Sequence, residues 1–151
     1  PVIGIAEAAM HTATLVATRF SIVTTLPRTL VIARHLLQQY GFTHHCAALH
    51  AIDLPVLALE DGSGLAQEKV RQRCIQAKRE DGCGAIVLGC GGMATLAASL
   101  TQELEMPVID GVSAAVKMVE SLVALGFGTS KQGDLAYPLH KPLSGAFQHL
   151  N

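Results

Sequence analysis

A cysteine lies among glycines in the stretch Gly89-Cys90-Gly91-Gly92, where a short apolar run stops and a helical pattern begins. Glycines let the backbone turn sharply and let a ligand approach the main chain closely. A thiol there can exchange a proton near neutral pH, because the free N–H groups of a following helix stabilise a thiolate. The same N–H groups can hold an enolate-like oxygen. Cys90 is therefore the candidate acid/base group.

A second polar cluster, Thr24-Thr25-Leu26-Pro27-Arg28-Thr29, falls at the same kind of boundary. The hydroxyl and free N–H groups of this cluster suit a carbonyl or carboxylate of a ligand. The structural alternative is that Thr25 or Thr29 caps the following helix. Cys90 has a structural alternative as well, because free cysteines are commonly buried.

Other kinds of site have weaker support. The seven histidines, among them His44, His45 and His50, have no further ligands at metal-site spacing, so no metal site is predicted. The glycine-rich turn could cradle a phosphate, but it lacks the Lys-Ser/Thr of a P-loop, and no G-x-G-x-x-G motif is present. No C-x-x-C pair occurs, so the thiols are expected to be free in a reducing cytoplasm. The remaining three cysteines are expected to be structural: Cys46, Cys74 and Cys83.

The composition indicates an α/β protein with a core of ordinary size. The chain has 151 residues, of which 50% are apolar, and its formal net charge is −1. Because no basic cluster stands out, nucleic-acid and anionic-membrane binding are not expected. No apolar run reaches the ~18 residues of a membrane-spanning helix.

Short β-branched runs alternate with longer helical patterns, which predicts a parallel sheet with helices on both faces. Ligands bind such sheets at the C-terminal ends of the strands. The end of a strand is predicted at residues 1–5, and further strands are predicted at residues 20–25, 45–51, 85–88 and 107–109. Helices are predicted at residues 6–19, 28–40, 63–79, 93–104 and 112–125, and the chain from residue 126 onward is predicted to be loop.

The chain contains a weak internal repeat, in which PVIGIAEAAM at residues 1–10 aligns without gaps on PVIDGVSAAV at residues 107–116. A strand followed by an Ala-rich helix in both places favours a duplicated fold. Cys90 precedes the second copy, so its counterpart would lie upstream of Pro1. The chain opens on this strand-like segment without an initiator Met. We therefore expect a fragment that lacks one of two catalytic cysteines.

Three segments resemble the aspartate/glutamate/hydantoin racemase superfamily: FSIVTTLPRT at residues 20–29, AIVLGCGGMA at 85–94 and PVIDGVSAAVKMVESL at 107–122. The opening PVIGIAEAAM and the ending AYPLHKPLSGAFQHL resemble its hydantoin and allantoin racemase branch. The resemblance implies a pseudo-symmetric fold of two similar α/β lobes that face each other across a cleft. Each lobe would offer one cysteine, and no cofactor or metal would be used.

The resemblance also implies an isomerase that racemises allantoin or a related 5-substituted hydantoin. One thiolate would remove the proton at the ring stereocentre while the other thiol delivers a proton to the opposite face. Cys90 matches the cysteine of the second lobe. Four further residues match positions that contact substrate: Thr24, Thr25, Gly91 and Gly92.

The implied organisation places residues 1–19 at the end of lobe one, residues 20–125 in lobe two and residues 126–151 in a segment that returns toward lobe one. The implied partner is a small-molecule substrate, and a cytoplasmic homo-oligomer is expected. Two alternatives stay open. One is a decarboxylase or isomerase of the same superfamily that uses Cys90 alone, and the other is a non-catalytic lobe that binds an anion.

Overall fold

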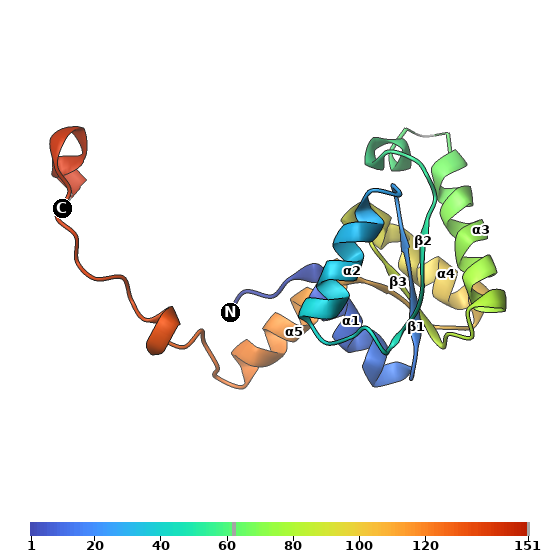
Figure 1. Ribbon diagram of the computed structural model, residues 1–151, viewed down its shortest axis with the longest axis horizontal. Coiled ribbons are helices and arrows are strands. Elements are labelled where there is room, and N and C mark those ends of the chain that lie inside the picture. The colour runs from blue at the N-terminus through green and yellow to red at the C-terminus, as the bar shows by residue number, and fades with distance from the viewer. Residues whose placement is uncertain (62, 151) are drawn as a thin grey trace.

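The computed structural model describes residues 1–61 and 63–150 and contains a parallel four-stranded sheet with helices on both faces (Figure 1). The strand order is β2-β1-β3-β4, with β1 at Phe20–Thr24, β2 at Cys46–Ala51, β3 at Ala85–Leu88 and β4 at Val108–Asp110. The α-helices are α1 (Ile5–Val16), α2 (Thr29–Gln39), α3 (Leu65–Glu80), α4 (Ala97–Leu104) and α5 (Gly111–Ala124). The predicted α/β class with a covered parallel sheet is confirmed.

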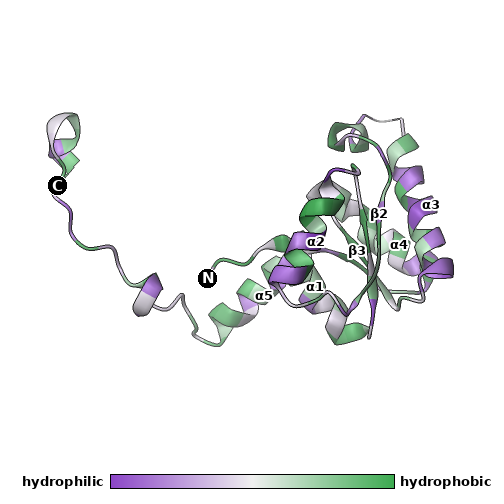
Figure 2. Ribbon diagram, viewed as in Figure 1, coloured by the Kyte–Doolittle hydropathy of each residue, from purple (hydrophilic) through white to green (hydrophobic). Residues whose placement is uncertain are grey.

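The two central strands, β1 and β3, are buried along their whole length, because helices cover both faces of the sheet. Phe20 and Ile22 of β1 belong to the core shared with α1 and α2. Val23 belongs to the core on the opposite face, shared with α3 and α4. Figure 1 shows α1 and α2 on one side of the strands and α3 and α4 on the other, and Figure 2 shows hydrophilic residues on α3.

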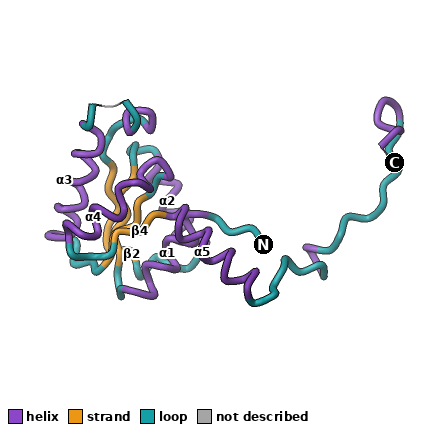
Figure 3. Tube along the Cα trace, turned by 180° about the vertical axis from the view of Figure 1, so that it is seen from behind, coloured by secondary structure: helices purple, strands orange, loops and turns teal. Residues whose placement is uncertain are grey.

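The strand predicted at residues 1–5 is wrong. Residues 1–4 have no regular secondary structure, and α1 begins at Ile5, with Ala8 N donating to Gly4 O at 2.9 Å (Figure 3). An extended segment becomes a strand only when another strand pairs with it. In the part of the chain that the structure describes, no strand pairs with residues 1–4. The helix also ends earlier than predicted, at Val16, because the backbone of Ala17 is extended (φ −150°, ψ 151°).

The helix predicted at residues 93–104 is two elements. Gly91–Leu96 forms a 3₁₀ helix, η2, and the α-helix α4 begins only at Ala97. Met93 N donates to Cys90 O at 3.0 Å, which is the i→i+3 bond of a 3₁₀ turn. Two consecutive glycines disfavour an α-helical start here. The remaining predicted strands and helices are confirmed within one or two residues at each end.

Residues 126–150 extend away from the sheet and are exposed at every position (Figures 1 and 3). They form loops with two 3₁₀ turns, η3 at Gly133–Leu135 and η4 at Gly145–Leu150. The predicted loop character of this segment is confirmed. None of the helices in the described part of the chain has both the length and the apolar character needed to span a membrane.

The side chain of Thr101 closes the outer edge of β4. Its Oγ1 accepts a hydrogen bond from Val108 N at 3.0 Å and donates one to Val108 O at 3.2 Å. The other edge of β4 pairs with β3. A single hydroxyl therefore satisfies both main-chain groups that Val108 would otherwise present as an open sheet edge.

The first turns of α1 and α5 are in unusually close contact. A Cβ atom on Gly111, the first residue of α5, would overlap the carbonyl oxygen of Ile5, the first residue of α1. Asp110 caps α5, with its Oδ1 accepting from Ser113 N at 2.7 Å. The absence of a side chain at residue 111 is what allows the two helix starts to meet.

We expect Thr101→Val to lower the free energy of unfolding by about 1–3 kcal/mol, because it leaves two main-chain groups of Val108 without a partner. Thr101→Ser keeps the hydroxyl and should cost less. Urea denaturation of the two variants and the parent checks this. A Thr101→Val variant no less stable than Thr101→Ser would show that the hydroxyl does not hold the edge.

Replacing glycine by alanine within a helix ordinarily gains about 0.5–1 kcal/mol. We expect Gly111→Ala to lower Tm instead, because the new Cβ would push α1 away from α5. Gly128→Ala is the matched control, since a Cβ there meets no atom within 4 Å. Thermal denaturation of both variants measures the difference, and an unchanged or higher Tm for Gly111→Ala would contradict the close packing.

Candidate active site

The carboxyl ends of β1 and β3 meet at the candidate site. Val23 pairs with Leu88, and Gly89 N donates to Val23 O at 2.8 Å. A Cβ atom on Gly89 would lie 2.9 Å from Thr24 Cβ, closer than real Cβ atoms approach one another. Only glycine allows this approach, which brings Thr24 beside the main chain that leads into Cys90.

Cys90 lies one residue beyond the end of β3, after Gly89, in extended backbone (φ −146°, ψ 132°), and precedes η2. Its side chain is half-buried and packs against the core between the sheet, α3 and α4. The long α-helix expected next to the thiol begins only at Ala97, so the short η2 takes its place. Partial exposure still leaves the thiol accessible to a small ligand.

A cavity of about 210 Å³ lies beside Cys90, between α1, α2 and the ends of β1 and β3. Thr24 and Thr29 supply its hydroxyl groups. An apolar cavity with a few fixed polar groups suits a small ligand. The other lining residues are apolar or glycine: Ile5, Ala6, Met10, Ile22, Ile32, Ala33, Leu36, Val87, Leu88, Gly89, Gly91 and Gly111.

Thr24 and Thr29 form a pair of hydroxyl groups in this cavity, with their Oγ1 atoms 3.0 Å apart. Thr29 Oγ1 donates a hydrogen bond to Leu26 O at 2.7 Å, and Thr24 Oγ1 donates a longer one to Gly89 O at 3.4 Å. The alternative that Thr25 or Thr29 caps α2 is wrong, because the N-cap is Arg28 and no side chain caps this helix.

Of the five residues predicted for the site, Cys90, Thr24 and Gly91 line the cavity. Thr25 and Gly92 do not. Thr25 is buried, and its carbonyl accepts from Leu54 N at 3.4 Å. Gly92 faces the segment between β2 and α3, where an added Cβ would lie 3.2 Å from Leu59 Cδ1.

The other three cysteines are free thiols that do not line the cavity. Burial raises the pKa of Cys74 to about 12 and the pKa of Cys46 to about 11. The thiol of Cys83 donates a hydrogen bond to Ala77 O, with 3.7 Å between Sγ and O. Thiols with such high pKa values stay protonated at neutral pH, so Cys46 and Cys74 are unsuited to proton transfer.

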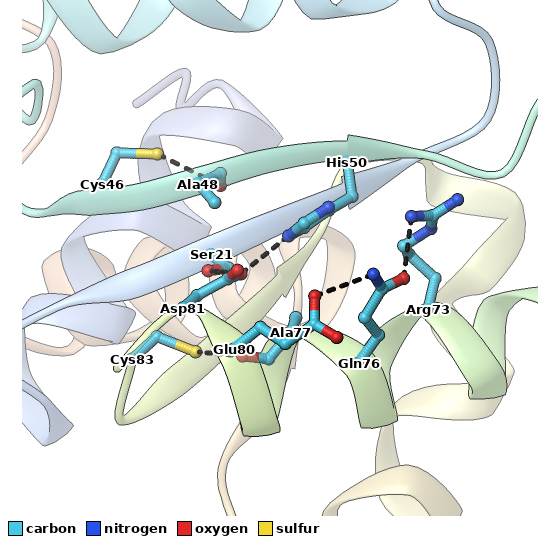
Figure 4. A network of polar contacts seen from close by, with 10 residues as sticks. All are labelled: Ser21, Cys46, Ala48, His50, Arg73, Gln76, Ala77, Glu80, Asp81 and Cys83. Atoms are coloured by element: carbon cyan, nitrogen blue, oxygen red, sulfur yellow. Dashed lines mark hydrogen bonds and ion pairs between the residues drawn. The ribbon is translucent and has the colours of Figure 1, made fainter.

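A partly buried polar network that the sequence does not predict lies on the α3 side of the sheet (Figure 4). Ser21 Oγ donates to Asp81 Oδ2 at 2.5 Å, and His50 Nε2 lies 2.7 Å from the same oxygen. The three residues come from β1, the end of α3 and β2, so no local motif brings them together. None of them lines the cavity beside Cys90.

The histidines gather into no metal site in the described chain, where no group of three or more His, Cys, Asp or Glu could hold a metal ion. His50 pairs with Asp81, and His45 Nδ1 lies 3.0 Å from Thr18 O. Glu7 is half-buried on α1, with Oε1 3.9 Å from His11 Nε2, and does not line the cavity.

Sequence reasoning does not identify Thr29 and Gly111 as cavity-lining residues. A sequence signal does exist for Thr29, because it follows Thr24 across a turn that contains Pro27. Gly111 offers none, because its contact with Ile5 joins segments far apart in the chain.

The family model described as Asp/Glu/Hydantoin racemase matches residues 1–119. A hydantoin racemase of Rhizobium meliloti is 48% identical over 145 residues, which are 96% of this chain and 60% of that protein. A hydantoin racemase of Paenarthrobacter aurescens is 44% identical over 141 residues, 93% of this chain and 60% of that protein.

Solved structures of racemases are also similar to this chain. The allantoin racemase from Klebsiella pneumoniae matches with a TM-score of 0.91 and 83% identity, covering 100% of this chain and 62% of that one. The allantoin racemase from Pseudomonas fluorescens matches with a TM-score of 0.85 and 42% identity, covering 96% and 62%. The chain thus spans about 60% of the length of the relatives it matches. It belongs to the Asp/Glu/hydantoin racemase family.

Proposed function

We propose that this chain is part of a cofactor-independent racemase that interconverts the enantiomers of allantoin or a related 5-substituted hydantoin. The observation that carries the proposal is the half-buried thiol of Cys90 beside a small cavity that Thr24 and Gly91 also line. The similarity to two solved allantoin racemases and to two hydantoin racemases supports this choice of substrate class.

The proposed chemistry takes place at C5 of the five-membered ring, next to a carbonyl group. The thiolate of Cys90 takes the proton from C5, and the electron pair of the broken C–H bond moves into the carbonyl to give an enolate. A second thiol then protonates C5 on the opposite face and the carbonyl re-forms. Cys90 ends protonated and its counterpart ends as the thiolate, so the two groups exchange roles in the next turnover.

We propose that the second thiol comes from residues outside this chain, because no other cysteine among the described residues lines the cavity. Cys46 and Cys74 are excluded by their raised pKa values. Cys83 donates to a main-chain carbonyl of α3 instead of facing a ligand. The chain's coverage of about 60% of each curated relative leaves room for another lobe.

The proposed organisation has residues 1–19 at the end of lobe one, residues 20–125 as lobe two, and residues 126–151 returning toward lobe one. The exposure of residues 126–150 supports the last part, because side chains such as Phe127 and Phe147 are large and apolar. α1 also packs on the sheet through Ala9, Met10 and Ala13, so the end of lobe one would touch lobe two directly.

The proposal also includes a cytoplasmic protein that assembles as a homo-oligomer and takes a small-molecule substrate. The four free cysteines fit a reducing compartment. Ile5 and Ile32, which line the cavity, and Val112, which lies beside Gly91, are exposed apolar residues, as expected of a face that another subunit or lobe covers.

We expect Cys90→Ser in the full-length protein to lower the rate of allantoin racemisation by about 100-fold or more, because a positioned acid/base group is lost. Racemisation is followed by circular dichroism, starting from a single enantiomer. Cys83→Ser is the matched control and should keep the parental rate, since Cys83 does not line the cavity.

A Cys90→Ser protein that racemises at the parental rate would refute the assignment of Cys90. Parental protein that decarboxylates a prochiral malonate-type acid but racemises neither allantoin nor a 5-substituted hydantoin would favour the decarboxylase alternative. Ligand binding without either reaction, unchanged in Cys90→Ser, would favour a non-catalytic lobe.

A further inference from the structure

The wall on one side of Cys90 is built by residues 52–61, which follow β2. This segment contains η1, a 3₁₀ helix at Val56–Leu59. A Cβ placed on Gly92 would lie 3.2 Å from Leu59 Cδ1, 3.8 Å from Val56 Cγ1 and 3.8 Å from Cys90 Sγ. The thiol and the two η1 side chains therefore converge on the same space above Gly92. Leu59 is also buried in the core against which Cys90 packs.

The start of this segment is tied to the turn that follows β1. Ile52 N donates to Thr24 O at 3.0 Å, and Leu54 N lies 3.4 Å from Thr25 O as a donor. The segment thus leaves the sheet beside Thr24, a cavity-lining residue, and crosses over to Gly92. In Figure 1, η1 lies at the end of the sheet where α2 begins.

Leu59, the last residue of η1, is tied to α3 by the side chain of Gln67, which lies in the first turn of that helix. Gln67 Nε2 donates to Leu59 O at 2.5 Å. The orientation of the amide follows from chemistry, because the opposite one would set two carbonyl oxygens against each other. The bond fixes the last residue of η1, whose side chain touches the space above Gly92.

Gln67 is a costly residue for this position. Its Oε1 is buried without a hydrogen-bond partner among the described residues. An unpaired buried acceptor is unfavourable, whereas an apolar side chain of similar size would leave no such group. The one hydrogen bond that the amide makes to η1 is the feature that an apolar side chain could not supply.

We propose that Gln67 is a positioning residue for Cys90. It holds Leu59 and Val56 against Gly92, and this wall restricts the thiol to the orientation in which it faces the cavity. The proposal rests on the proposed racemase function, because a proton-transfer group must approach C5 from one face, and small errors in position lower the rate strongly.

The first test measures the thiol itself and needs no turnover. Cys90 alkylation by iodoacetamide is followed by peptide mapping in the parent, Gln67→Met and the matched control Gln72→Met, whose amide bonds to exposed Glu68 on the same helix. Gln67→Met removes the donor and keeps the side-chain length. We expect at least a threefold faster reaction in Gln67→Met and the parental rate in Gln72→Met. Cys74 must stay unlabelled throughout, as expected of a buried thiol in a folded chain.

A second variant covers the case in which Gln67→Met does not fold. Val56→Ala shortens a half-exposed side chain of the wall beside Cys90. It should therefore also speed the alkylation of Cys90 at least threefold. Parental alkylation rates in the folded Gln67 and Val56 variants would overturn the proposal.

The second test is steady-state kinetics of the full-length protein with allantoin. Gln67→Met should lower kcat about tenfold and leave KM within twofold, because the thiol is misplaced while the ligand contacts at Thr24 and Gly91 persist. An unchanged kcat would overturn the positioning role. If the parent itself shows no racemase activity while the alkylation rates change as expected, the proposed function fails and the packing of Gln67 on the Cys90 wall stands.

Discussion

The close approach of the main chain at Gly89 to the side chain of Thr24 is the constraint on which the candidate site depends. A Cβ at this position would lie 2.9 Å from Thr24 Cβ, so any other residue would force the end of β3 away from β1. The hydrogen bond from Gly89 N to Val23 O would then lengthen or break. Because Cys90 and Gly91 follow directly, both would move away from the hydroxyl pair of Thr24 and Thr29.

This constraint places the thiol of Cys90 between a cavity and a packed wall. On one side of Cys90 lies the small cavity that Thr24 and Gly91 line, and on the other lies the wall formed by η1. The fold thereby separates four similar side chains, because Cys46 and Cys74 are held protonated by burial and Cys83 points to a main-chain carbonyl. Position in the fold, more than the identity of the residue, distinguishes Cys90 chemically.

The sequence predicts the sheet well, because β1 and β3 are short apolar runs bounded by turn residues. The structure buries both strands completely. It also predicts Cys90, Thr24 and Gly91 at the cavity, since each follows or ends a strand and such ends share one edge of a parallel sheet. It fails at residues 1–4, where a strand-like pattern has no pairing strand in the described chain. It misses Gln67 and Gly111 as well, because their importance comes from contacts with Leu59 and Ile5 that arise only in the folded chain.

Deuterium uptake at C5 in deuterated water shows whether Cys90 serves one face of the ring. The full-length protein carrying Cys90→Ser is incubated separately with (R)- and (S)-allantoin, and deuterium in recovered starting material is measured by NMR. We expect that one enantiomer still exchanges while the other does not, because only one of two opposed acid/base groups is lost. Parental exchange rates for both enantiomers would contradict it.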